Sequence, residues 1–178
     1  QRRIRRGQAG RQKGADANRQ RKLESQTNAK DWARSTLTEL SKRDLLMLGI
    51  GLYWGEGTKH GPGPASLVNS DAKLLKVGKT WLISVFELAP EDFRPYVFIN
   101  SDHESRCDSI VDYWSKHLDI DRGQFHVVYL RQKHTKYYDN YDSYYGVCAL
   151  RIRKSTHVRY KILALIERVG TLAMTGKK

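Results

Sequence analysis

The sequence has 178 residues, of which 39% are hydrophobic, and it carries a formal net charge of +13 at pH 7. No apolar run approaches the ~20 residues that cross a bilayer, and no signal peptide is visible, so we expect no membrane partner. A charge this positive favours an anionic polymer such as a nucleic acid as the partner. Cys107 and Cys148 lie in otherwise apolar segments, which is typical of reduced core thiols and of an intracellular protein.

The first thirty residues form a strongly basic segment. Residues 1–30 hold ten Lys or Arg against two acidic residues, and Ile4 and Leu23 are their only large apolar side chains. Such a composition cannot bury enough surface to fold by itself, so we predict a flexible arm or linker that contacts DNA. It could become helical on DNA or against a partner, and a solvated, solubilising tail is the alternative. The candidate DNA-binding residues of this arm are Arg2, Arg3, Arg5 and Arg6.

From residue 31 the composition becomes globular, and the pattern predicts one α+β domain over 31–178 with a mixed or antiparallel sheet. Capping residues at Ser41 and Asp44 predict a helix that runs through 45–54. The later elements follow by periodicity and turn signals. They are a strand at 66–69, a helix at 72–88, a strand at 94–100, a helix at 105–118, strands at 124–132 and 146–154, and a closing helix at 157–170. We expect the last two strands to form a hairpin with a long tip.

The stretch GIGLYWGEG, residues 49–57, places glycines in a helix. Each glycine in a helix interior costs about 1 kcal/mol relative to alanine. Gly51 and Gly55 lie on one helix face, where a second helix could approach closely and offset this cost. We therefore predict a helix-pairing face formed by Gly51, Leu52 and Gly55. Glu56 lies in the last turn, where the helix dipole disfavours a carboxylate, so we expect it to bind a divalent cation. A solvated helix-end glutamate is the alternative.

These nine residues resemble the signature of the LAGLIDADG homing endonucleases. Gly51 falls on the glycine of that motif, Leu52 on its second leucine, Gly55 on the small residue before the acid, and Glu56 on the catalytic acid. A looser similarity to small bacterial and phage relatives extends over about residues 43–170. It is carried by the segments VNSDAKLLKVGKTWL, WSKHLDI and YYGVCALRIRK.

The resemblance implies a fold in which two motif helices pack at a two-fold interface and the flanking sheets saddle the DNA. Each helix then delivers one acid to shared Mg²⁺ (or Mn²⁺) ions. The sequence departs from the family at Tyr53 and Trp54, where an aliphatic residue and an acid are usual, and in the extra helix at 105–118. The segment 163–170 is only superficially similar to the motif, because it lacks the paired small residues. With one motif per chain, a homodimer is implied.

The function implied by the resemblance is site-specific, Mg²⁺-dependent cleavage of double-stranded DNA by a homodimer. A two-fold symmetric dimer favours a palindromic or nearly palindromic target. The alternative is a non-catalytic, sequence-specific transcriptional regulator that retains the fold, and an RNA-binding protein is a third possibility. We expect a cytoplasmic, nucleoid-associated protein encoded by a bacterium or a phage.

Further residues are candidates for contact with DNA or for catalysis. In the strand at 146–154, Arg151 and Arg153 alternate with inward-facing residues and give one basic face. The tip at 131–146 mixes five tyrosines with cations, a combination that can contact phosphates and bases, although a disordered polar loop is the alternative. The cations of this tip are Arg131, Lys133 and Lys136. Lys59 could hold phosphate or orient water next to Glu56, or be an ordinary surface lysine.

Two kinds of cofactor site are not expected. The six histidines are scattered and no paired-cysteine motif accompanies them, which argues against structural zinc. No glycine-rich phosphate loop of either common type is present, so no nucleotide cofactor is expected.

Overall fold

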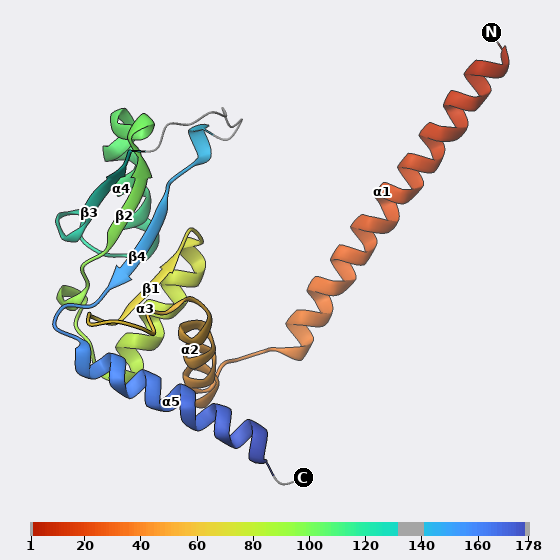
Figure 1. Ribbon diagram of the computed structural model, residues 1–178. Coiled ribbons are helices and arrows are strands. Elements are labelled where there is room, and N and C mark those ends of the chain that lie inside the picture. The colour runs from red at the N-terminus through yellow and green to blue at the C-terminus, as the bar shows by residue number, and fades with distance from the viewer. Residues whose placement is uncertain (1, 132–140, 177–178) are drawn as a thin grey trace. The chain divides into compact units, whose positions relative to one another are not determined.

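The computed structural model describes residues 2–131 and 141–176, and the chain divides into two units, Gln1–Ser41 and Lys42–Lys178 (Figure 1). The first unit contains the helix α1 (Arg2–Thr36). All its residues from 11 onward are exposed. A continuous helix thus occupies residues 2–36, which include most of the segment where composition predicted a flexible arm over 1–30, and the second unit begins at Lys42.

Two features of the sequence explain why α1 is helical without a buried face. Most of its residues are good helix formers such as Arg, Lys, Gln, Glu and Ala. Side chains one turn apart also bond to one another, as the amide of Gln12 does to Asp16 and the amide of Gln20 to Glu24. These contacts are local, so α1 needs no hydrophobic core.

The second unit is built on a four-stranded sheet with the strand order β1-β4-β2-β3. Its strands are β1 (Ser66–Asn69), β2 (Tyr96–Asn100), β3 (His126–Leu130) and β4 (Val147–Arg151). β4 is antiparallel to both β1 and β2, whereas β3 runs parallel to β2 at the edge. The α+β class and the mixed sheet are therefore as expected.

The predicted hairpin between the last two strands is wrong, because β2 lies between β3 and β4. β2 and β3 are parallel neighbours, and parallel neighbours need a crossover connection, which the helix at 107–118 provides. Residues 101–125 return the chain to the end of the sheet at which β2 began. The helix that the sequence predicted in this segment therefore makes β3 a parallel neighbour of β2.

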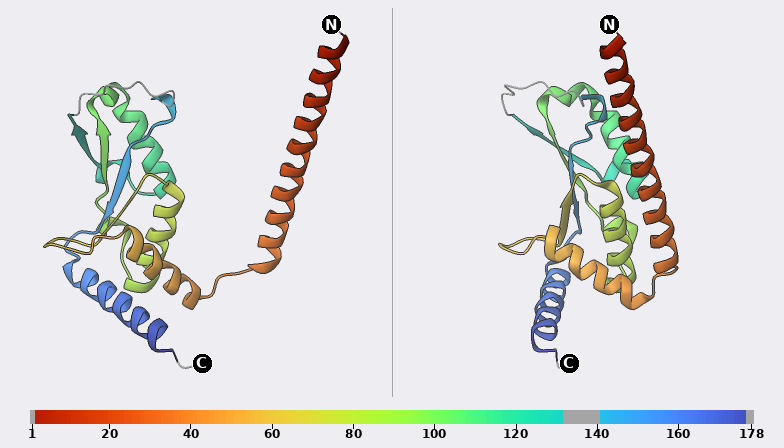
Figure 2. Two further views of the ribbon diagram at one scale, coloured as in Figure 1. Left: turned by 45° about the vertical axis from the view of Figure 1, so that its right-hand side comes forward. Right: turned by 90° about the vertical axis from the view of Figure 1, so that its right-hand side faces the viewer.

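Two of the four described helices of this unit lie on one face of the sheet (Figures 1 and 2). These two are α3 (Ala72–Phe86) and α4 (Cys107–Leu118), while α2 (Lys42–Glu56) and α5 (Thr156–Thr175) pack beside each other and α2 packs on α3. Short 3-10 turns occupy Pro90–Asp92, Ser101–Arg106, Arg122–Gln124 and Tyr141–Ser143. The described helices leave the other face of the sheet, which we call the outer face, open.

The core lies between the sheet and α2, α3 and α4. Trp81 and Trp114 are its largest fully buried side chains, and Leu67, Cys148 and Leu150 face them from the strands. Burial raises the pKa of the Cys148 thiol, and both cysteines are free. Within the described part of the chain, every helix is too short or too polar to cross a membrane.

Helix ends in this unit are satisfied by specific side chains. Asp71 caps α3, since its carboxylate accepts hydrogen bonds from the backbone N–H groups of Lys73 (2.8 Å) and Leu74 (3.3 Å). At the end of α4, the ammonium of the buried Lys79 donates to the carbonyls of Leu118 (2.8 Å) and Asp119. Burial lowers the pKa of Lys79. This contact also joins α3 to α4.

Asp71→Ala should lower the free energy of unfolding by about 1 kcal/mol, because two backbone N–H groups of α3 lose their acceptor. Urea denaturation followed by circular dichroism measures this change. Asp121→Ala, which removes a carboxylate bonded to a single N–H in a short 3-10 turn, should cost less. Equal stability of Asp71→Ala and the parent protein would contradict the capping role.

Candidate functional site

Two of the glycines in residues 49–57 are required by packing within the chain. A Cβ atom added at Gly49 would overlap the buried indole of Trp81, and one added at Gly57 would overlap the ring of Tyr53. Both rings are fully buried and cannot move aside. Gly49 and Gly57 therefore allow α2 to lie directly on the core.

Gly51 and Gly55 are different, because no described residue packs against them. Both are exposed, and a Cβ atom added at either would meet no described heavy atom within 4 Å other than those of adjacent residues and of the surrounding helix backbone. Each nevertheless lowers helix propensity. Leu52, the third residue of the predicted pairing face, is half-buried. The structure thus brings the two glycines to the surface as the pairing prediction requires.

The two glycines belong to a longer exposed stripe, which we call the α2 face. It consists of Met47, Leu48, Gly51, Trp54 and Gly55, which follow one another at helical spacing. The three large side chains are 40–48% exposed. Isolated apolar residues on a surface are ordinary, but a continuous apolar stripe is typical of an interaction surface.

Glu56 is the last residue of α2 and its side chain is exposed. Next to it, the ammonium of Lys59 donates to the carbonyl oxygens of Trp54 (2.8 Å) and Gly55 (3.3 Å). Lys59 thereby caps the end of α2 and places a positive charge where the helix dipole is negative. The chain itself thus offsets part of the penalty that led us to expect a cation beside Glu56.

Within the described residues, a single copy of this site supplies few protein ligands for a divalent metal ion. Mg²⁺ requires about six oxygen ligands, and no group of three or more His, Cys, Asp or Glu side chains in the described residues is arranged to hold a metal. Glu56 contributes one carboxylate, and Lys59 already occupies two carbonyls of the last turn. Mg²⁺ commonly completes its coordination with water and substrate phosphates, beside one or two carboxylates.

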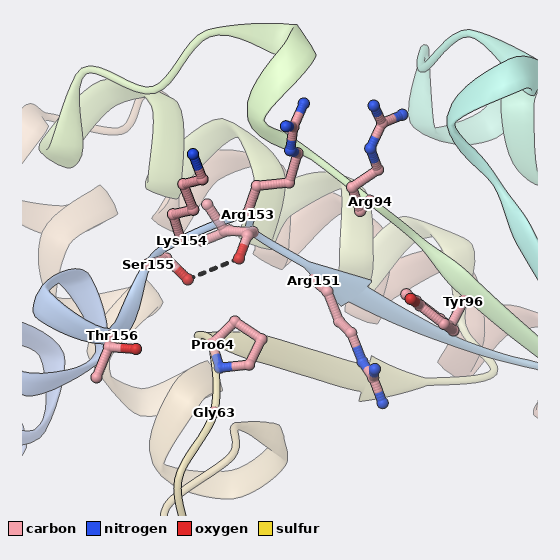
Figure 3. Close-up of a pocket in the computed structure, with 10 residues that line it drawn as sticks. Gly63, Pro64, Arg94, Tyr96, Arg151, Arg153, Lys154, Ser155 and Thr156 are labelled. Carbon is pink, nitrogen blue, oxygen red and sulfur yellow. Dashed lines mark hydrogen bonds between the residues drawn. The ribbon is translucent and has the colours of Figure 1, made fainter.

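A second site lies on the outer face of the sheet, where β4 leads into α5 (Figure 3). The sequence predicted that Cys148, Leu150 and Ile152 face inward, and all three are buried, although Ala149, between them, is buried as well. Arg151 is half-buried and Arg153 is exposed. Both arginines line a cavity of about 290 Å³.

Two cations of this cavity were missed by the sequence analysis. Arg94 precedes β2 and Lys154 follows Arg153, and both line the cavity. Arg94 is placed there by its backbone N–H, which donates to the carbonyl of Arg151 at 2.8 Å. The position of Lys154 directly after Arg153 could have identified it from the sequence. Arg94 could not be identified in this way, because it reaches the cavity through a hydrogen bond between distant segments.

An aromatic row supports the arginines of the outer face. The guanidinium of Arg151 lies over the ring of Tyr96, 4.2 Å from its centroid. Tyr96 in turn stacks on His126, with ring centroids 4.8 Å apart. This row crosses β4, β2 and β3, and the cation–π contact limits the movement of the Arg151 side chain.

The tip at 131–146 is only partly described. Arg131 is exposed just after β3, whereas Lys133 and Lys136 lie outside the described residues. Three of the five tyrosines of this tip lie in the described residues, and each contacts a ring of the domain, while Tyr141 stays 43% exposed. Tyr141 stacks on His103 with ring centroids 4.5 Å apart, and Tyr144 meets the same imidazole in a tilted arrangement at 4.9 Å. Tyr145 stacks on Tyr113, with ring centroids 3.8 Å apart.

The side chain of Arg106 binds the backbone of residues 141–144. Its guanidinium donates to the carbonyls of Tyr141, Asp142 (2.7 Å) and Tyr144 (3.1 Å). The alternation of tyrosine and polar residues in the sequence did not reveal this arrangement, because the partners lie more than thirty residues away. The contacts of Arg106 therefore fix the position of these tyrosines.

The remaining predicted DNA contacts lie in α1. Arg2, Arg3, Arg5 and Arg6 occupy its first turns. A helix of this charge is attracted to a nucleic acid backbone irrespective of sequence.

A comparison of the chain with protein-family models, with curated protein sequences and with solved structures found no match in any of the three.

The structure predicts opposite effects for two neighbouring glycines. Gly51→Ala should raise the free energy of unfolding by up to about 1 kcal/mol in dilute, monomeric protein, because helix propensity improves and the added methyl meets nothing. Gly49→Ala should lower it by about 1–3 kcal/mol, because the methyl overlaps Trp81. Urea denaturation of both variants tests this. A destabilising Gly51→Ala substitution would show that Gly51 is packed within the chain.

Proposed function

We propose that this protein is a site-specific double-stranded DNA endonuclease that acts as a homodimer with Mg²⁺ or Mn²⁺. One observation carries the proposal. An exposed acid, Glu56, ends a helix whose two exposed glycines, Gly51 and Gly55, have open space around them. The similarity of residues 49–57 to the LAGLIDADG signature supports the same conclusion, as does the net charge of +13.

The pairing of two α2 helices follows from energetics. Gly51 and Gly55 together cost helix stability, and no contact with the described residues compensates for that cost. Close packing of this face against a second copy supplies the missing contact. In a two-fold interface the same residues meet, and an axis that runs along the paired helices would bring both copies of Glu56 to the same end.

The dimer would also complete the ligand set that one chain lacks. Two Glu56 carboxylates, water and phosphate oxygens of the substrate would together give the oxygen coordination that Mg²⁺ prefers. When bound, such an ion lowers the pKa of a coordinated water and stabilises charge on the phosphate oxygens. Lys59 keeps the last turn of α2 closed and so fixes the position of Glu56.

The basic groups outside this centre would bind the DNA backbone. The arginines of α1, Arg131, and Arg151 with Arg153 on the outer face of the sheet supply positive charge on both units. Binding through such groups weakens as salt rises. A protein with this activity would work in the cytoplasm of a bacterium, associated with the nucleoid.

A non-catalytic DNA-binding regulator is the second candidate, and one observation favours it. The ammonium of Lys59 lies on the last turn of α2, next to Glu56, and provides a resident cation there. A helix end that is satisfied in this way needs no metal for stability. Pairing through the α2 face would then serve dimerisation and the symmetric reading of DNA alone.

Glu56→Gln should slow Mg²⁺-dependent cleavage of a duplex library by roughly 10²-fold or more, because a ligand for the charge-stabilising ion is removed. Sequencing of the cleaved ends measures the rate and the site. Glu167→Gln is the matched control, since Glu167 is also an exposed helical glutamate. Cleavage by neither the parent protein nor the control, with binding retained, would support the regulator instead.

Gly55→Leu should weaken dimerisation by at least 10-fold, because a branched side chain separates the two helices at their closest approach. Sedimentation equilibrium gives the dissociation constant. Gly14→Leu is a suitable control, since Gly14 lies in α1 and also has open space around it. If Gly55→Leu and the parent protein dimerise equally, the pairing face lies elsewhere.

A further inference from the structure

The cavity at the start of α5 is distinct from the α2 face. Its walls come from three segments: Gly63 and Pro64 after α2, Arg94 and Tyr96 at β2, and the turn between β4 and α5. Figure 3 shows that Arg94 and Arg153 extend to the same side, whereas Arg151 extends to the other, beside Tyr96. All three arginines line the cavity.

The positive charge of this cavity is not balanced by the residues that line it. Arg94, Arg151, Arg153 and Lys154 line it, and none of the lining residues is acidic. Among the described residues, ion pairs are formed by Arg34 and Arg122 and by none of these four cations. Like charges held close together repel one another, so an anion bound among them would stabilise the fold.

Backbone hydrogen bonds hold Arg94 and Arg153 in place, so their guanidinium groups are not needed for this and can bind an anion. The N–H of Arg94 donates to the carbonyl of Arg151, and the N–H of Arg153 donates to the carbonyl of Asp92, both at 2.8 Å. Arg151 is further held over Tyr96. A guanidinium presents several N–H donors in a plane and binds phosphate oxygens in a bidentate manner.

The turn that carries Arg153 and Lys154 is fixed by a buried hydroxyl. Ser155 is 1% exposed, accepts a hydrogen bond from the N–H of Ala65 and donates one to the carbonyl of Ile152, both at 2.8 Å. Lys154 has a φ of 46°, in the left-handed region. The turn is therefore pre-formed, and it leads into α5, whose N-terminal N–H groups also favour an anion.

We propose that this cavity binds a phosphate group, with Arg94 and Arg153 as its main ligands and Arg151 and Lys154 as supporting cations. That this phosphate belongs to the backbone of DNA rests on the proposed function. A free phosphate ester would be held by the same chemistry. The two sources differ in the experiment that follows.

The first arm of the test uses inorganic phosphate as the probe. Phosphate should raise the midpoint of thermal unfolding more than chloride does at equal ionic strength, and should shift the backbone amide NMR signals of residues 153–157. Both effects should disappear in the double variant Arg94→Gln/Arg153→Gln. They should persist in Lys116→Gln/Arg168→Gln, which removes two exposed cations of α4 and α5.

The second arm uses a duplex of DNA. The Arg94→Gln/Arg153→Gln variant should bind the duplex more weakly, and the slope of log affinity against log salt should fall by about one for each cation that no longer reaches a phosphate. The exposed Arg153 can be replaced alone by Gln without disturbing the core, so Arg153→Gln repeats the measurement in a variant that folds.

The outcomes separate the two proposals. If phosphate acts equally on the parent protein and on both Arg153 variants, or shifts amides elsewhere only, the cavity is not a phosphate site. If the parent protein binds the duplex and the variants bind it with the same affinity and salt dependence, the cavity proposal fails while the proposed function stands. If phosphate binds at residues 153–157 but no duplex binds, the cavity proposal stands for a free phosphate ester and the proposed function fails.

Discussion

The contact between Gly49 and Trp81 decides how α2 lies on the rest of the domain. The indole is fully buried, and α2 can approach it only because Gly49 has no side chain. One turn later, Tyr53 packs against Trp81 with ring centroids 6.3 Å apart, and its hydroxyl donates to the carbonyl of Thr58 at 3.0 Å. Burial raises the pKa of this phenol. With α2 fixed at these points, its rotation is fixed as well.

That rotation exposes Gly51 and Gly55. The glycines of residues 49–57 therefore divide into two groups with different physical roles. Gly49 and Gly57 serve packing inside the chain, whereas Gly51 and Gly55 lower helix stability and gain no contact from the described residues. A cost without compensation within one molecule is the physical basis for proposing a second molecule at this face. The proposed role of Glu56 in metal binding depends on that pairing, because one chain offers a single carboxylate there.

Local patterns predicted most of the elements and part of the sites. The helical spacing of 72–88 and the inward positions of Cys148, Leu150 and Ile152 depend on neighbouring residues, and both appear in the structure, although Ala149 is buried as well. The pairing of strands could not be predicted in this way: β3 follows a crossover helix and joins β2, so chain order suggested the wrong neighbour for β4. The same limit hid Arg94, which reaches the outer face through a pairing with Arg151. It also hid Arg106, which binds the segment at 141–144.

Oxidative cross-linking of Gly55→Cys tests the pairing of α2 helices most directly. Two cysteines form a disulfide only when their Cα atoms lie within about 7 Å, a separation that closely packed helices reach at a glycine. We predict rapid formation of a covalent dimer by Gly55→Cys and slow formation by Lys116→Cys, which places an equally exposed thiol on α4. Equal, slow cross-linking of both variants would contradict the pairing of two chains through Gly51 and Gly55.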